Sequence, residues 1–134
     1  MDGLNQATAA GVFRWTHPPQ SEIRSWKTDA NHDLLQAQCR FAGFTHSRRI
    51  EFCKPDLILV DDEVTGPAGE HLIEQFWHLG SPEARLNVIP EGEADLQEGW
   101  RSRVFGDKDR TPVLRVSRRC QLPVRFKTRI DLRR

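Results

Sequence analysis

The sequence has few of the features that mark a zinc-binding, disulfide-rich or membrane-spanning protein. Its three cysteines, Cys39, Cys53 and Cys120, are an odd number and stand in none of the paired spacings that zinc sites use. We therefore expect them to be small, buried, apolar side chains. No apolar run approaches the roughly 20 residues that cross a bilayer, and the N-terminus lacks the charged start and apolar stretch of a secretory signal. The sequence thus predicts no membrane partner.

The chain also lacks an excess of charge of either sign. Twenty Lys and Arg residues stand against nineteen Asp and Glu residues, which leaves a net charge of +1. A non-specific nucleic-acid binder needs a broad positive field, so the sequence predicts no nucleic-acid partner, and any basic patch must be local. With 134 residues, of which 37% are hydrophobic, the chain is large enough for one core. We expect a single domain over residues 1–134.

Helical periodicity is scarce, and a period of two residues dominates instead. The segment 33–41 places Leu35, Ala37, Cys39 and Phe41 on one face of a strand. The segment 121–132 alternates for longer, with one face made of Leu122, Val124, Phe126, Thr128, Ile130 and Leu132. Pro123 removes a ladder donor, which predicts that this last strand begins at a sheet edge. The nearly all-apolar run 56–61 predicts a central strand covered on both faces.

Turn signals separate these strands at short intervals and favour antiparallel pairing. The strings "CKPD" and "TGPAGE" flank the apolar run, since Pro fixes φ and Gly supplies positive φ. Further strands are expected at 11–15, 21–27, 72–79, 85–89, 100–105 and 113–118. Residues 105–112, "FGDKDRTP", are expected to form an exposed loop. The pattern predicts an all-β protein, an antiparallel β-sandwich of roughly nine to eleven strands.

Five strings between residues 2 and 80 resemble, in order, the C-terminal region of heparinase II/III-like proteins. They are "DG..Q" (Asp2, Gly3, Gln6), "HSRRIEF", "LVDDEVTG", "GEH" and "EQFWHLG". Residues 81–134 add only a compatible strand pattern. The resemblance implies a polysaccharide lyase relative, in which an N-terminal α/α toroid and β-sandwich layers enclose the substrate cleft.

The same resemblance implies how the chemistry would be divided. Such lyases cleave uronic-acid-containing glycans by β-elimination, which needs a neutralised carboxylate, a base for the C5 proton and an acid for the leaving oxygen. Most catalytic residues, typically including a Tyr, come from the toroid, and a His lies on a strand before the "DG" turn. We expect both upstream of Met1, and the sequence contains no Tyr. The resemblance therefore implies a fragment that has no catalytic residues of its own and is inactive in isolation. Its parent chain resembles a lyase, whether or not that parent is active.

The resemblance also implies partners and a location. The toroid of the same parent chain and an acidic polysaccharide are the expected partners, and the parent would be periplasmic or secreted. An exposed sheet edge could also support a homodimer. The alternative is a non-catalytic carbohydrate-binding or interaction module that recognises acidic polysaccharide.

His46 is the candidate metal ligand, because some lyases of this group hold zinc through His and Asp side chains. No Asp stands in "FRWTHPP", where an acidic partner is expected, so we expect no cofactor and a polar His beside a turn, with zinc as the alternative. The acidic run Asp61, Asp62 and Glu63 is expected to cap a strand and open a solvated turn.

Arg48, Arg49 and His78 are the candidate substrate-binding residues. Guanidinium groups bind carboxylates and sulfates in a bidentate manner, and a further stripe of Arg125, Lys127 and Arg129 could follow a chain of anions. The alternatives are a solvated strand face for the stripe and a His78 that is hydrogen-bonded within the inter-sheet packing. Large aromatic residues in a sandwich are usually core, so the same is expected of Trp15, Trp26 and Trp100.

Overall fold

The computed structural model describes residues 1–80 and 87–132, and this part of the chain is all-β. The described residues contain no helix that is long and apolar enough to span a membrane. The strands are β1 (Thr8–Ala9), β2 (Trp15–Thr16), β3 (Gln20–Thr28), β4 (His32–Phe41), β5 (Phe44–Cys53), β6 (Leu57–Thr65), β7 (Glu70–His78), β8 (Asn87–Pro90), β9 (Ala94–Arg101), β10 (Asp109–Gln121) and β11 (Val124–Asp131).

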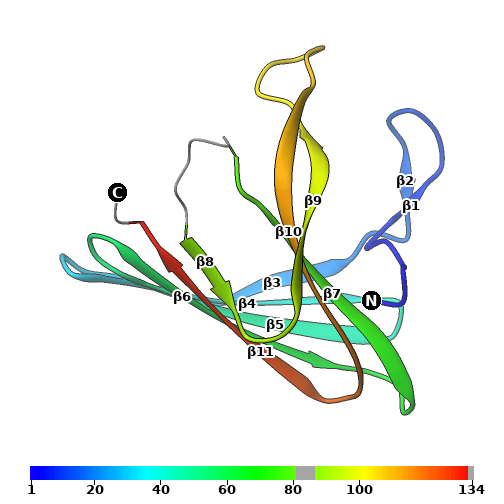
Figure 1. Ribbon diagram of the computed structural model, residues 1–134. Helices are drawn as coiled ribbons and strands as arrows, with labels where there is room; N and C mark the ends of the chain where they lie inside the picture. The colour runs from blue at the N-terminus through cyan, green and yellow to red at the C-terminus, as the bar shows by residue number, and fades with distance from the viewer. Residues whose placement is uncertain (81–86, 133–134) are drawn as a thin grey trace.

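The strands form a large sheet, a smaller sheet over it and a short ribbon. The large sheet has six strands in the order β3-β4-β5-β6-β11-β8, and the smaller sheet has the order β7-β10-β9. All of their pairings are antiparallel, and β1 pairs with β2 separately. The three-stranded sheet stands over one face of the six-stranded sheet (Figure 1). We call this covered side the inner face and the opposite side the outer face.

The first hairpin of the large sheet shows how local sequence sets the register. Ala42 and Gly43 connect β4 to β5 with φ values of 49° and 82°. Two consecutive positive φ angles are typical of the two-residue turn whose twist matches antiparallel strands. Phe41 therefore pairs with Phe44, and the ladder continues without interruption to His32 and Cys53.

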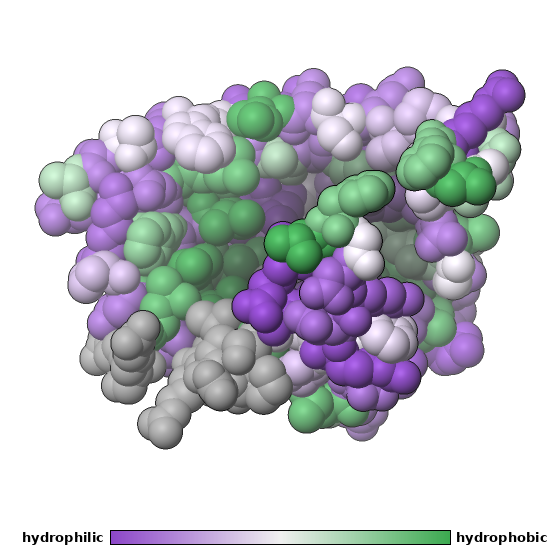
Figure 2. All heavy atoms as spheres, turned by 90° about the horizontal axis from the view of Figure 1, so that it is seen from above, coloured by the Kyte–Doolittle hydropathy of each residue, from purple (hydrophilic) through white to green (hydrophobic). Residues whose placement is uncertain are grey.

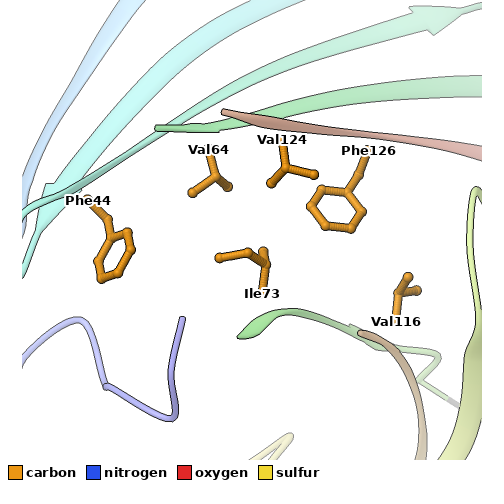
Figure 3. Packing of buried hydrophobic residues seen from close by; sticks show 6 residues of the cluster. All are labelled: Phe44, Val64, Ile73, Val116, Val124 and Phe126. Atoms are coloured by element: carbon orange, nitrogen blue, oxygen red, sulfur yellow. The ribbon is translucent and has the colours of Figure 1, made fainter. Parts of the chain in front are cut away.

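The hydrophobic core lies between the two sheets (Figure 3). Phe44, Val64, Val124 and Phe126 extend from the six-stranded sheet, and Ile73 and Val116 meet them from β7 and β10. Phe126 is among the largest fully buried side chains, with 2% of its surface exposed. Each side chain of this kind stabilises the fold by about 1.5–3 kcal/mol relative to an exposed one. The core thus joins strands that are far apart in sequence.

The inner face is not fully covered. Ile23 and Trp26 on β3 are 66% and 65% exposed. Seen from the side of the three-stranded sheet, the molecule has a hollow in which apolar side chains gather (Figure 2). The smaller sheet therefore covers only part of the larger one.

Most of the expected strands are confirmed. The strands expected at 21–27, 72–79 and 113–118 correspond to β3, β7 and β10, each longer by a few residues or shifted by one or two. In β11, Val124, Phe126 and Thr128 are buried, whereas the residues between them are exposed. Its start borders only β6, because β8 pairs with β11 from Thr128 onward, which agrees with the edge position expected from Pro123.

Three expectations about strands and loops are corrected, and a fourth can be compared only in part. Residues 11–13 are bends, and the short pairing begins only at Trp15. The strand expected at 100–105 is wrong in its bounds, because the observed strand, β9, begins at Ala94 and ends at Arg101. The strand expected at 85–89 lies partly outside the described residues, and β8 covers its end. In the loop expected at 105–112, Phe105 is fully exposed, but Thr111 is a buried residue of β10.

The expected burial of several residue types is also wrong. The apolar run 56–61 is not covered on both faces, because β6 alternates between buried inner residues and half-buried outer ones. The three cysteines are free and only partly buried. Trp15, Trp26 and Trp100 are 62%, 65% and 46% exposed rather than core. Lys108 and Arg110 lie over the Trp100 ring, at 4.2 and 3.9 Å from its centroid.

Replacing Phe126 with Ala should lower the free energy of unfolding by about 3–5 kcal/mol, because a large cavity would open between the sheets. Urea denaturation followed by circular dichroism measures this change. The matched control is Phe105→Ala, since Phe105 is fully exposed and its loss should change stability by less than about 0.5 kcal/mol. Equal losses in the two variants would contradict this account of the core.

Candidate functional site

An open pocket of about 720 Å³ lies on the inner face, where β7 and the N-terminal segment meet β5 and β6. Its lining includes His46, Arg48, Asp62, Gln75, Trp77 and Trp15. These residues combine hydrogen-bond donors with aromatic surface. We refer to this space as the inner pocket.

The buried carboxylate of Asp62 is the centre of the inner pocket. Only 1% of its side chain is exposed. Its Oδ1 accepts hydrogen bonds from Arg48 Nε and contacts His46 Nε2, both at 2.6 Å. Its Oδ2 accepts from Arg48 Nη2 at 2.9 Å and from Gln75 Nε2 at 2.6 Å. Both oxygens are thus fully engaged, and one donor comes from the opposite sheet.

Strand register brings these groups together. His46 and Arg48 are two residues apart on β5, so both point to the inner face. Arg48 is the cross-strand partner of Asp62 on β6. Gln75 and Trp77 alternate with outward residues on β7, and the Arg48 guanidinium lies 5.3 Å from the Trp77 ring centroid. A cation over an indole face is a favourable contact, and here it positions the guanidinium at the pocket wall.

Burial raises the pKa of Asp62, but the hydrogen bonds and charges of His46 and Arg48 outweigh it, so that the pKa is lowered overall. The carboxylate is therefore ionised at neutral pH. It orients His46 and Arg48 in return, because each is held through a nitrogen that faces Asp62. The remaining guanidinium nitrogen of Arg48, Nη1, and Nδ1 of His46 are left for other partners.

The N-terminal segment forms another wall of the inner pocket and is fixed by Asp2. Its carboxylate accepts a hydrogen bond from the Leu72 backbone N–H at 2.7 Å and contacts His71 Nδ1 at 2.7 Å. The Asp2 N–H donates to the Leu72 carbonyl at 2.8 Å. The hydrogen bond with His71 lowers the pKa of Asp2, and the bond with Asp2 raises the pKa of His71. The pair is thus charged on both sides at mildly acidic pH.

Four of the five strings that carry the resemblance line the inner pocket, and the fifth, "GEH", contacts the N-terminal segment beside it. "DG..Q" and "GEH" meet through Asp2 and His71, and Gln6 lines the inner pocket. "HSRRIEF", "LVDDEVTG" and "EQFWHLG" meet in the network of Asp62. Segments up to 70 residues apart in sequence therefore converge.

A second groove, of about 500 Å³, lies on the outer face of the same sheet. Its charged side chains are Arg24, Arg49, Asp61, Glu63, Arg125 and Lys127, in addition to the inward-facing Arg48 and Asp62. Arg49 lies 3.6 Å from Asp61, and Arg125 lies 3.3 Å from Glu63. Four of the outward lining side chains are cations and two are carboxylates, and Arg24 and Arg49 also form ion pairs with Glu22 and Glu51.

The three expected substrate-binding residues do not converge. Arg48 points into the inner pocket, whereas the neighbouring Arg49 points to the outer groove and contacts Glu51 at 2.6 Å. His78 is exposed, and it alternates with Trp77 on β7, so it faces away from the inner pocket. The interpretation of His78 as a residue packed between the sheets is therefore wrong.

The expectations for His46 and the acidic run are also corrected. His46 lies within β5 rather than beside a turn, and its acidic partner is Asp62. The acidic run lies inside β6, where it neither caps the strand nor opens a turn. A zinc ion does not fit here, because Arg48 and Gln75 occupy the oxygens of Asp62. No third His, Cys, Asp or Glu ligand joins the pair within the described ranges.

Asp62, Gln75 and Trp77 are the site residues that the sequence analysis missed. Asp62 stands two residues from Val60 on one side and from Val64 on the other, so period two places all three on one face. This signal predicts burial of the carboxylate. Gln75 and Trp77 come from the other sheet, and no local pattern identifies them.

No protein-family model and no curated protein sequence matches the chain. Among solved structures, it is similar to the "Heparinase III-BT4657 gene product", with a TM-score of 0.71 and 16% identity over 84% of this chain and 21% of that one. It is also similar to heparan sulfate lyase HepC from Pedobacter heparinus, with a TM-score of 0.69, 16% identity and the same coverage. The chain thus spans about a fifth of these proteins. The resemblance to heparinase-like proteins is confirmed for the fold.

Replacing Asp62 with Asn should lower the free energy of unfolding by about 3 kcal/mol, because the partly buried Arg48 and His46 would lose the charge that compensates them. The control is Asp61→Asn, on the outer face of the same strand and 44% exposed, with an expected loss below about 1 kcal/mol. Urea denaturation at neutral pH measures both. A similar small loss in the two variants would mean that the network contributes little to the fold.

Proposed function

We propose that this chain is the β-sandwich part of a polysaccharide lyase of the heparinase II/III type and that its inner pocket contacts an acidic saccharide. The convergence of four of the five resemblance strings on the inner pocket carries this proposal. Residues that only stabilise a sandwich need not gather at one opening. The similarity in fold to two heparinase-type structures supports the same conclusion.

The chemistry of the inner pocket suits a charged sugar. Arg48 retains N–H donors beyond those used by Asp62, and guanidinium N–H groups pair with carboxylate and sulfate oxygens. Trp15 borders the inner pocket and is 62% exposed, so that its ring is open to stacking on a sugar face. His46 adds a donor or acceptor at Nδ1. Uronic acids and sulfated sugars offer the matching anions and apolar ring faces.

We further propose that the 134-residue chain contacts substrate without cleaving it. β-Elimination needs a base, an acid and a group that neutralises the substrate carboxylate, all at one sugar. The sequence has no Tyr, and the His46 Nε2 atom is engaged by Asp62. In a longer parent chain, a toroid would face the inner pocket and supply the remaining groups. A periplasmic or secreted parent would meet such glycans directly.

A second candidate function rests on the outer groove. Arg125 and Lys127 are alternate residues of β11 and lie about 6–7 Å apart, and Arg24 and Arg49 add guanidinium groups from β3 and β5 on the same outer face. A row of cations at this spacing can follow an acidic chain. The chain would then be a non-catalytic module that binds acidic polysaccharide on its outer face.

Binding of heparan sulfate oligosaccharides by isothermal titration calorimetry tests the proposed function. Trp15→Ala should weaken binding by about fivefold to tenfold, because a stacking contact is worth about 1 kcal/mol. The matched control is Trp26→Ala, which removes an equally exposed indole that does not border the inner pocket. This control should bind like the unaltered chain. The ultraviolet absorbance of unsaturated uronate should stay constant with the chain alone and rise with an active parent.

Other outcomes reassign the site. Loss of binding in Arg125→Gln/Lys127→Gln, with unchanged binding in Trp15→Ala, would favour the outer groove. Unsaturated product from the chain alone would contradict the proposal that the sandwich contacts substrate and the toroid supplies the groups needed for cleavage. Absence of binding to every acidic glycan would contradict both functions.

A further inference from the structure

A cluster of three metal-ligating side chains lies on the outer face, away from the inner pocket. His32 on β4 and Glu51 and Cys53 on β5 place one ligand atom each within 4.8 Å of the other two. All three residues are partly buried. Among the described residues, this cluster is the group of three or more His, Cys, Asp and Glu side chains whose ligand atoms all lie within this distance of one another.

Strand register and an ordered turn hold the cluster in place. His32 and Cys53 are cross-strand partners, and Glu51 shares their face because it lies two residues before Cys53. The Asp29 carboxylate accepts hydrogen bonds from the N–H groups of Asn31 and His32, both at 2.8 Å. Lys54 N–H donates to the Asn31 carbonyl at 2.9 Å, next to Cys53. The backbone on both sides of the cluster is therefore fixed by hydrogen bonds.

The donor atoms are already directed toward one another. His32 Nε2 and Glu51 Oε1 are 2.7 Å apart, and Arg49 Nη1 lies 2.6 Å from the other carboxylate oxygen. Zinc ligands lie about 2.0–2.3 Å from the ion, which places them about 3.3–3.8 Å from one another in a tetrahedron. Small side-chain rotations from the present separations reach this geometry.

We propose that His32, Glu51 and Cys53 bind a zinc ion, with water in the fourth position. The combination of imidazole, carboxylate and thiolate suits zinc, whereas calcium and magnesium take oxygen ligands. A thiolate and a carboxylate together balance the charge of the ion. Arg49 keeps its contact with the second oxygen of Glu51 and fixes the orientation of the first. This site is distinct from the one expected at His46, and it does not depend on the proposed saccharide function.

Cobalt titration of the metal-free chain tests the site directly. Co²⁺ replaces zinc in tetrahedral sites, and a bound thiolate adds a charge-transfer absorption in the near ultraviolet. One equivalent of Co²⁺ should produce this band, and Zn²⁺ should displace it. Cys53→Ser should abolish the band. His32→Gln removes a direct ligand and should weaken Co²⁺ binding by at least about 10- to 100-fold, which is the loss typical of removing a residue that only supports a ligand.

The other two cysteines supply matched controls. Cys39→Ser and Cys120→Ser should retain the band, because neither residue belongs to the cluster. Circular dichroism of each metal-free variant checks that it folds. If Cys53→Ser does not fold, His32→Gln provides a second test. Absence of a thiolate band in the unaltered chain would overturn the proposal. The same band in Cys53→Ser, or unchanged affinity in His32→Gln, would overturn it as well.

Discussion

The buried carboxylate of Asp62 is the interaction on which the rest of the structure depends. A charge with 1% of its side chain exposed is strongly unfavourable unless donors surround it. Arg48 and His46 supply donors from the same sheet, and Gln75 supplies one from the opposite sheet. The two sheets are thus joined by a polar contact beside the apolar core. Because this contact has a fixed geometry, it specifies how the sheets are placed in a way that apolar packing alone does not.

The pleat of the six-stranded sheet distributes the chemistry over two surfaces. Inward residues of β5 and β6 line the inner pocket, and the residues between them line the outer groove. At the far end of β4 and β5, the same alternation directs His32, Glu51 and Cys53 outward. Adjacent residues such as Arg48 and Arg49 therefore have unrelated roles. A saccharide on one face and a metal on the other would not compete for the same side chains.

The sequence predicts the strands of this fold better than it predicts which side chains of different strands contact one another. Period two correctly predicts the burial of Val124, Phe126 and Thr128 in β11, because alternation is a local property of one strand. The same alternation predicts that the Asp62 side chain is buried, because Asp62 lies between two inward valines. The contact of Asp62 with Gln75 depends instead on how two sheets pack, and no local pattern records it. The exposure of Trp26 has a related reason, since the three-stranded sheet covers only part of the inner face.

The pKa of Asp62 in the folded chain, followed by carboxyl-carbon NMR, tests the central claim most directly. An unperturbed Asp titrates near pH 3.9. If the hydrogen bonds of His46 and Arg48 outweigh burial, the pKa lies below this value. The stabilisation by the network is then fully present above about pH 3.9 and is lost as the pH falls through the lower, folded-state pKa. A pKa at or above the ordinary value would mean that burial dominates, and it would contradict the role of Asp62 as the ionised centre of the inner pocket.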